Sequence, residues 1–175
     1  MRIVTKLSVI VFAVGLISVM IAGTGFCQER RSDGEIMGLM MATDRNEIAA
    51  AQQAQSKKIS VDVEAYAKMI QSEHTADLNK YMDLAAKLNI NVPGTTGTVS
   101  RAKGVKDRAL LMTKNGTDYE RGYLADMIKG HMETLDLIDQ LSKDAQSPDL
   151  KAQLSSTKSS VQMHLDKARD LQTKL

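Results

Sequence analysis

The sequence predicts an all-α protein: an antiparallel four-helix bundle with a short extra helix in the connection between its second and third helices. The first observation is composition. The 175 residues include two prolines, two phenylalanines and no tryptophan, whereas Ala, Leu, Met, Lys, Gln, Asp and Glu dominate, which favours helix over sheet. The second is apolar periodicity at helical spacing in four long segments. The third is that two joints are short enough to require antiparallel neighbours.

The N-terminal segment, residues 1–27, has the three-part layout of a secretory signal peptide. Arg2 and Lys6 precede an uncharged apolar run over residues 7–22, and small residues follow. Because this run is shorter than the roughly 20 residues that span a bilayer, we expect cleavage near Cys27 rather than a retained membrane anchor. Lipid attachment to Cys27 is a second alternative. We therefore predict an exported protein of the periplasm or cell envelope, with one mature domain over residues 28–175.

Cleavage would change both the charge and the cysteine content of the protein. The 23 Lys and Arg residues, less the two in the signal peptide, leave 21 against 21 Asp and Glu, so the mature domain is formally neutral. It would also contain no cysteine, and hence no disulfide. Residues 101–114 are locally basic but contain no aromatic residue to stack on bases, so we predict no nucleic-acid partner.

The first two long helices are predicted on either side of a tight joint. Periodicity predicts a first helix over residues 34–57, and Ser60 is the expected N-cap of a second helix that continues to about Asn89. The apolar stripe of the first consists of Ile36, Leu39, Met40, Thr43, Glu47, Ala50, Ala51 and Ala54. That of the second includes Ala67, Ile70, His74, Leu78, Tyr81, Ala85 and Leu88.

A long connection precedes the last two long helices. Residues 91–104 are rich in Gly, Thr and Pro and are predicted to form a loop, the natural place for a protein partner, while residues 105–112 form the short extra helix. Thr117 followed by Glu120 predicts a capping box at the start of the third long helix. Ser147 and Pro148 predict the N-cap and first turn of the fourth. The two stripes contain Tyr123, Leu124, Met127, His131, Leu135, Ile138 and Leu141, then Leu150, Leu154, Thr157, Val161, His164, Ala168 and Leu171.

Polar residues interrupt all four stripes at one level of the predicted bundle. The three histidines of the chain, His74, His131 and His164, lie on three different stripes, and Glu47 interrupts the remaining one. Counting residues from the two tight joints places all four near the middle of the bundle, within roughly 9 Å along its axis at a rise of 1.5 Å per residue. Buried polar groups are costly unless they are paired or bound, so we expect these four to converge.

Two interpretations of this cluster remain open. In the first, the imidazoles and the carboxylate form a hydrogen-bonded core network that fixes the helix register in a structural or interaction protein. In the second, Glu47, His74, His131 and His164 bind one divalent transition metal such as zinc, iron, manganese or copper, since imidazole and carboxylate suit all of these ions. Asp44 and Asp77 lie one turn from this set and are candidate outer partners of the ligands, although a solvated position is the more common one for either.

Methionine is unusually frequent, with eleven in the chain. Several lie near the histidines or on the stripes, and soft thioether sulfurs beside imidazoles would favour copper. The simpler interpretation is that a bundle without tryptophan uses methionine as flexible core filler. The methionines concerned are Met37, Met40, Met41, Met69, Met127 and Met163.

Four stretches of the sequence resemble a family of exported bacterial proteins, the domain of unknown function 4142 family. They are DRNEIAAAQQAQSKKIS, VDVEAYAKMIQSEHTADLNKYMDLAAKLNI, DYERGYLADMIKGHMETLDLIDQ and VQMHLDKARDL. The resemblance covers about residues 35–171, and it implies a ferritin-like helical bundle and an envelope location. It also implies that Glu47 and the three histidines occupy the polar core positions of the family, but it implies no activity.

The chain departs from the ferritin-like di-iron enzymes, which take a Glu from each of two helices and a Glu-x-x-His pair from each of the others. The residues three positions before the histidines are Gln71, Ile128 and Val161. We therefore expect at most a mononuclear site, and we place an oxidoreductase below a binding or structural protein. No catalytic residue is predicted, because no serine carries a flanking nucleophile motif and no cysteine survives cleavage.

Overall fold

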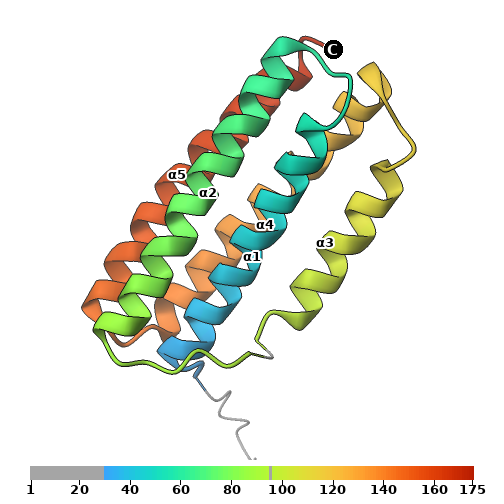
Figure 1. Ribbon diagram of the computed structural model, residues 1–175. Helices are drawn as coiled ribbons and strands as arrows, with labels where there is room; N and C mark the ends of the chain where they lie inside the picture. Colours follow the sequence, from blue (N-terminus) through green and yellow to red (C-terminus); the bar gives the residue numbers. More distant parts are fainter. Residues whose placement is uncertain (1–29, 95) are drawn as a thin grey trace, which may run out of the picture.

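The computed structural model describes residues 30–94 and 96–175, and these residues contain five helices and no strand, which confirms the predicted all-α class (Figure 1). The predicted signal peptide, residues 1–27, lies outside the described part. No helix within the described ranges is long and apolar enough to cross a membrane. The helices are α1 (Asp33–Gln55), α2 (Val61–Lys87), α3 (Thr98–Leu111), α4 (Gly116–Asp144) and α5 (Pro148–Gln172).

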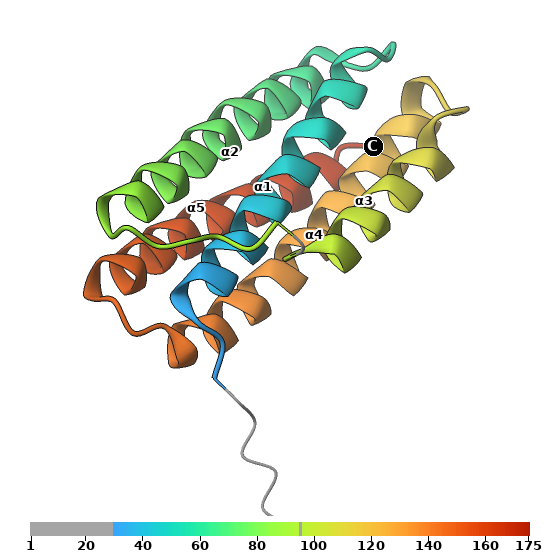
Figure 2. The same ribbon diagram turned by 60° about the horizontal axis from the view of Figure 1, so that its bottom comes forward.

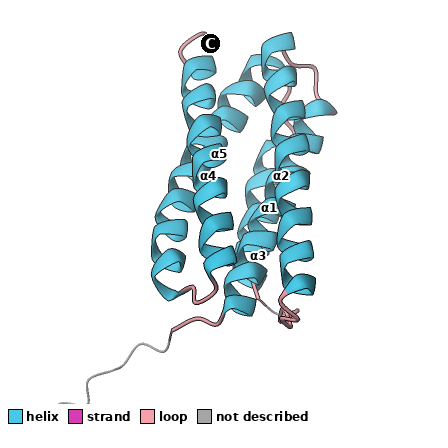
Figure 3. Cartoon of the chain, turned by 90° about the vertical axis from the view of Figure 1, so that its left-hand side faces the viewer, coloured by secondary structure: helices cyan, strands magenta, loops and turns pink. Residues whose placement is uncertain are grey.

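Four of these helices, α1, α2, α4 and α5, form the predicted antiparallel bundle. α1 packs along α2 and α4 packs along α5, and the two pairs meet through contacts of α2 with α5 and of α1 with α4. Figure 3 views these two pairs from the side. Every neighbouring pair around the bundle runs antiparallel. This arrangement allows the short joints from α1 to α2 and from α4 to α5.

The extra helix α3 returns the chain from one end of the bundle to the other. α2 and α4 run in the same direction, so the chain that leaves α2 must travel back before α4 begins. It crosses the side of α1 near the N-terminal end of that helix and then returns as α3 (Figures 1 and 2). The predicted extra helix at residues 105–112 was too short, because the helix starts at Thr98, within the expected loop. Packing of α3 against α1 and α4 outweighs the weak helix propensity of its first turns.

Two glycines allow this connection to lie directly on α1. A Cβ on Gly38 would meet the Thr96 side chain at 2.7 Å, so the space above this turn of α1 is filled by the connection itself. Gly97, the N-cap of α3, has φ of 77°, which glycine adopts without strain, and a Cβ there would lie 2.3 Å from Ala42. These close contacts fix where α3 begins.

The helix starts were predicted with mixed success. Ser147 caps α5 by accepting a hydrogen bond from the Leu150 amide, as predicted. Ser60 is the N-cap of α2 but makes no side-chain cap bond. The capping box predicted for α4 was wrong: Asn115 is the N-cap, and the buried Glu120 accepts a hydrogen bond from the Ser60 backbone N–H instead. The Glu120 carboxylate thereby provides an acceptor for a backbone amide at the α1–α2 joint, and both groups are paired.

The core consists of two apolar clusters with a polar layer between them. The cluster near the α1–α2 joint includes Tyr66, Ile70, Tyr123, Leu124 and Leu171. The cluster near the α4–α5 joint, called here the lower apolar cluster, includes Ile36, Met40, Tyr81, Ile138 and Leu154. On each bundle helix, the positions between the two clusters are occupied by the buried polar residues Asp44, His74, His131 and His164.

Candidate metal centre

The three histidines of the polar layer meet inside the bundle. His74 comes from α2, His131 from α4 and His164 from α5, and they are 3%, 1% and 1% exposed. Their ring centroids lie 5.2–5.9 Å apart. One nitrogen of each ring points into the cluster, and the three nitrogens lie within 4.8 Å of one another. Sequence spacing predicted that these histidines and Glu47 converge, and the structure brings the three histidines together.

The other nitrogen of each ring makes a hydrogen bond to an oxygen acceptor. His74 Nδ1 lies 2.9 Å from Asp44 Oδ1, and His164 Nε2 lies 2.9 Å from Glu73 Oε2. His131 Nδ1 lies 2.7 Å from the carbonyl oxygen of Met127, one turn earlier on α4. Since a carbonyl or an ionised carboxylate only accepts, each of these ring nitrogens is the N–H donor.

The inward nitrogens of the neutral rings therefore carry lone pairs. His74 Nε2, His131 Nε2 and His164 Nδ1 are buried and have no hydrogen-bond partner. A lone pair cannot hydrogen-bond to another lone pair, so three neutral imidazoles held in these tautomers cannot satisfy one another. A cation at the centre would satisfy all three, whereas a single added proton would satisfy one pair.

The protonation of the histidines is set by burial and by nearby carboxylates. Burial lowers the pKa of His131, and burial together with the charge of His74 lowers the pKa of His164 to about 4. Burial acts the same way on His74, but its bond to Asp44 and the charge of Glu47 outweigh burial and raise its pKa. Two of the three rings are thus held neutral, the form that binds metals.

The carboxylate of Asp44 is as deeply buried as the histidines, with 1% of the residue exposed. Burial raises its pKa to about 6, although the hydrogen bond to His74 opposes this. Its second oxygen, Oδ2, has no partner among the described residues. A buried, incompletely paired carboxylate is costly, and a positive charge in the neighbouring histidine cluster offsets that cost.

Glu47 lies beside the histidine cluster, but its oxygens are not part of the group of mutually close donor atoms. It faces the region between α1, α3 and α4, where it is partly buried, and its Oε2 is buried without a partner. Its charge nevertheless raises the pKa values of His74 and His131, so the carboxylate is near both rings. The position of α1 that enters the core at this level is Asp44.

Sequence reasoning missed two of the three groups that hold the imidazoles. Glu73 precedes His74 by one residue, so it was assigned to no stripe, yet it bonds His164 on α5. The Met127 carbonyl carries no sequence signal, because every residue has one. Asp44 was a candidate outer partner, and the structure places it on His74; Asp77 bonds Thr157 and Gln153 instead.

The donor set fits a divalent transition-metal ion. Imidazole suits zinc, copper, iron and nickel. Nitrogens bound to zinc at about 2.0–2.1 Å are spaced by roughly 3.3 Å in a tetrahedral site, so small ring movements would close the present spacing. Metal-binding histidines almost always donate their other N–H to a carboxylate or a backbone carbonyl, and all three histidines here do so.

The fold and this site define a class: helical bundles with a buried cluster of three histidines at mid-height. The chain belongs to the family described as domain of unknown function (DUF4142), whose model matches residues 25–171. The resemblance stated from the sequence is thereby confirmed. Among solved structures, the chain is similar in fold to "CopM in the Cu(II)-bound form", with a TM-score of 0.70 and 14% sequence identity over 83% of this chain and 99% of that one. No curated protein matches the chain in sequence.

Proposed function

We propose that this protein binds a single divalent transition-metal ion through His74, His131 and His164, with Glu47 as the fourth ligand. The observation that carries this proposal is the arrangement of three buried, unpartnered nitrogens within 4.8 Å of one another, each fixed by an acceptor on the far side of its ring. The buried, unpartnered Oε2 of Glu47 and the effect of its charge on two of the histidines support its inclusion.

Copper is the first ion to test, and zinc, iron and manganese follow. A protein of the same fold is described with Cu(II) bound, and three imidazoles suit Cu(II) as well as they suit zinc. The methionines add little support for a soft copper ion, because Met37 and Met40 are buried in the lower apolar cluster and Met163 is half-exposed. The proposed ligands are therefore three imidazole nitrogens and one carboxylate oxygen, without a methionine sulfur.

The proposed role is binding in an exported protein rather than catalysis. The apolar N-terminal segment with its two basic residues supports export to the periplasm or envelope. The alternative, a structural protein with a core hydrogen-bond network, accounts for the three outward bonds of the histidines. With His74 protonated, as its raised pKa favours, this network provides one inward N–H for two acceptor nitrogens, so one of them still has no donor.

Elemental analysis of the untagged mature protein, purified without chelator, tests this proposal. We expect about one equivalent of metal, and a melting temperature that falls when the ion is removed, because an ion at 100 times its dissociation constant stabilises the folded state by about 2.7 kcal/mol. A metal-free protein that also fails to bind added Cu²⁺, Zn²⁺, Fe²⁺ or Mn²⁺ would contradict it and favour the structural alternative.

A pair of variants separates loss of the ligand from loss of structure. His131→Ala removes one inward nitrogen and should abolish tight binding while the protein stays helical by circular dichroism. Thr157→Val is the matched control. Like His131 on α4, Thr157 on α5 is a buried polar residue, at 2% exposure, but its hydroxyl bonds Tyr81 and Asp77 rather than a histidine. Thr157→Val should retain one equivalent of metal.

A further inference from the structure

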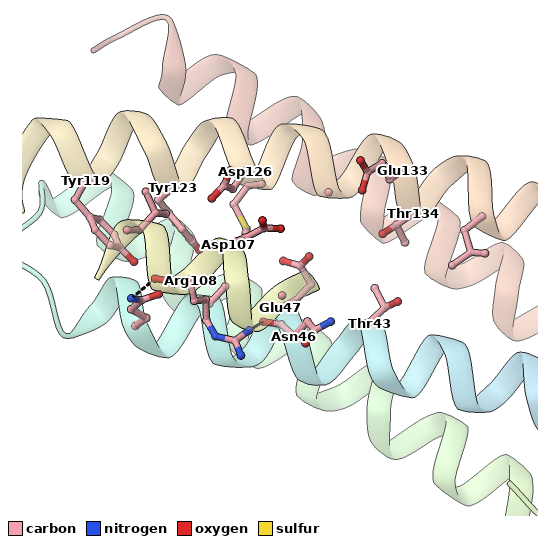
Figure 4. A pocket seen from close by; sticks show the side chains of 17 residues that line it. Thr43, Asn46, Glu47, Asp107, Arg108, Tyr119, Tyr123, Asp126, Glu133 and Thr134 are labelled. Carbon is pink, nitrogen blue, oxygen red and sulfur yellow. Dashed lines mark hydrogen bonds between the residues drawn. The ribbon is translucent and has the colours of Figure 1, made fainter. Parts of the chain in front are cut away.

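An acidic cavity of about 170 Å³ lies between α1, α3 and α4 (Figure 4). Four carboxylates line it: Glu47 from α1, Asp107 from α3, and Asp126 and Glu133 from α4. Arg108 is the one basic residue among the lining residues, and its Nη1 donates to the Asn46 backbone carbonyl. We call this space the acidic cavity. A concave surface with this charge concentrates cations.

The inner wall of the acidic cavity holds polar groups that lack partners. The hydroxyls of Tyr119 and Tyr123, residues that are 0% and 1% exposed, line the cavity and have no hydrogen-bond partner among the described residues. Oε2 of Glu47 is in the same state. Buried polar groups without partners at a cavity wall indicate that the cavity holds water or a polar guest.

The acidic cavity adjoins the histidine cluster at Glu47. Gly130 and Met127 line the cavity from α4; Gly130 directly precedes His131, and the Met127 carbonyl holds the ring of His131 in place. A Cβ built on Gly130 would lie 3.5 Å from Oε1 of Glu47. The Glu47 carboxylate therefore belongs to the cavity wall and lies near enough to His74 and His131 for its charge to raise their pKa values.

A second cavity, of about 100 Å³, lies between α2 and α5 and is lined by His74 and His164 themselves, whereas the acidic cavity reaches the cluster only through Glu47. Its carboxylates are already engaged: Glu73 bonds the outward nitrogen of His164, and Asp77 bonds Thr157 and Gln153. Lys80 also lines it and adds a positive charge. An ion on this side would meet the positive charge of Lys80 and carboxylates that already accept hydrogen bonds, whereas an ion in the acidic cavity would meet the unpartnered Oε2 of Glu47.

We propose that the acidic cavity is the entrance through which a divalent metal ion reaches the three-histidine cluster, and that Glu47 is the carboxylate that receives the ion from the cavity. This inference rests on the proposed metal binding, whose route it specifies. The other three carboxylates of the cavity, called the outer carboxylates, attract the hydrated ion; they are Asp107, Asp126 and Glu133. Glu47 then replaces one water molecule bound to the ion, and the imidazoles replace further water molecules. The outer carboxylates then act on the rate of binding more than on the final complex.

Two blocking variants compare the two routes. Gly130→Leu places a side chain in the acidic cavity beside Glu47, and leucine keeps α4 helical. Ser160→Leu places the same side chain in the α2–α5 cavity, which Ser160 lines. Uptake of Zn²⁺ by the metal-free protein is followed by stopped-flow transfer from a chromophoric chelator, and release by transfer back. Gly130→Ala is a control, because its methyl group would only make ordinary contact with Glu47.

We expect Gly130→Leu to slow both uptake and release of Zn²⁺ by about tenfold or more, with the dissociation constant changed much less, since an obstructed path affects both directions equally. Ser160→Leu and Gly130→Ala should match the wild type. Slowed exchange in Ser160→Leu with normal exchange in Gly130→Leu would overturn the entrance while leaving metal binding intact. A wild-type protein that takes up no metal would instead overturn the proposed function, and the entrance with it.

Salt dependence gives a second readout that does not depend on tolerance of a larger side chain. The double variant Asp126→Asn, Glu133→Gln removes two negative charges from the acidic cavity and adds almost no volume. We expect its Zn²⁺ uptake at low salt to slow by about threefold to tenfold, and the difference from the wild type to shrink at 1 M salt, where the Debye length is about 3 Å. Equal uptake rates at low salt would contradict electrostatic guidance by this cavity.

Discussion

Asp44 on α1 and His74 on α2 form a buried hydrogen bond of 2.9 Å, with 1% and 3% of the two residues exposed. The carboxylate fixes the tautomer of the imidazole, so that Nε2 presents a lone pair to the centre of the bundle. Glu73, which is partly exposed, holds His164 in the other tautomer: Nε2 donates to the carboxylate and Nδ1 carries the inward lone pair. These pairs join α1 to α2 and α2 to α5 at the level of the proposed metal, so binding and packing depend on the same contacts.

Asp44→Asn should weaken the binding of Zn²⁺ or Cu²⁺ by about 10–100-fold, the usual effect of losing a carboxylate that supports a metal-binding histidine. The amide keeps the size of the side chain but supplies a weaker acceptor. Competition titration against a chelator of known affinity measures the change. Asp77→Asn is the control, because Asp77 is a nearby carboxylate that bonds Thr157 and Gln153. If both variants lose affinity equally, charge rather than orientation accounts for the effect.

In the metal-free protein, His164 should contribute a loss of stability as the pH falls from about 6.5 to about 4. Its folded pKa of about 4 lies below its ordinary value of 6.5, so the unfolded chain binds more protons in this range and protonation favours unfolding. At about 1.4 kcal/mol per pKa unit, the contribution amounts to at most about 3 kcal/mol. Asp44, whose folded pKa is raised, acts in the opposite direction.

The His164 contribution is isolated by comparing the wild type with His164→Gln. Urea unfolding of both metal-free proteins is followed by circular dichroism at intervals between pH 7 and pH 4. The wild type should lose more free energy of unfolding than the variant over this range. Parallel pH profiles would show that His164 is not held neutral by the fold.

Ile138→Ala should destabilise the metal-free protein by about 2–5 kcal/mol, because Ile138 is fully buried in the lower apolar cluster and truncation leaves a cavity. Metal stoichiometry should stay at one, since the histidine layer is a separate part of the core. Met163→Ala is the control, because Met163 is 45% exposed and its loss should change stability by less than about 0.5 kcal/mol. Urea unfolding measures both.

The N-terminus of the mature protein should lie within residues 22–28, as intact-mass spectrometry of protein from its native host would show. This expectation follows from the apolar run that ends at Ala22 and from the small residues after it. A chain that begins at Met1 would contradict export by cleavage. A lipid-sized mass increment at Cys27 would identify the lipoprotein alternative.

The four long helices, their order and the level of the histidines could be predicted from the sequence. Four stripes at helical spacing and two tight joints require antiparallel neighbours, and a constant rise per residue sets the height of each polar position. This local arithmetic is why His74, His131 and His164 were correctly brought together, and why the cap at Ser147 was correct. The apolar periodicity of a helix is a property of its own sequence, so it can be recognised without knowing which helices pack against it.

Two features depend on how the helices pack together and could not be predicted from the sequence: the face of α1 that enters the core, and the groups that hold the imidazoles. Because α1 packs against α2, α3 and α4, two of its faces are covered; Asp44 reaches the histidines, while Glu47 lines the acidic cavity. The Glu73 bond joins α2 to α5, and the length of α3 depends on its contact with α1. Each of these depends on how a helix is rotated against its neighbours, and that rotation minimises the free energy of the whole core rather than of any one segment.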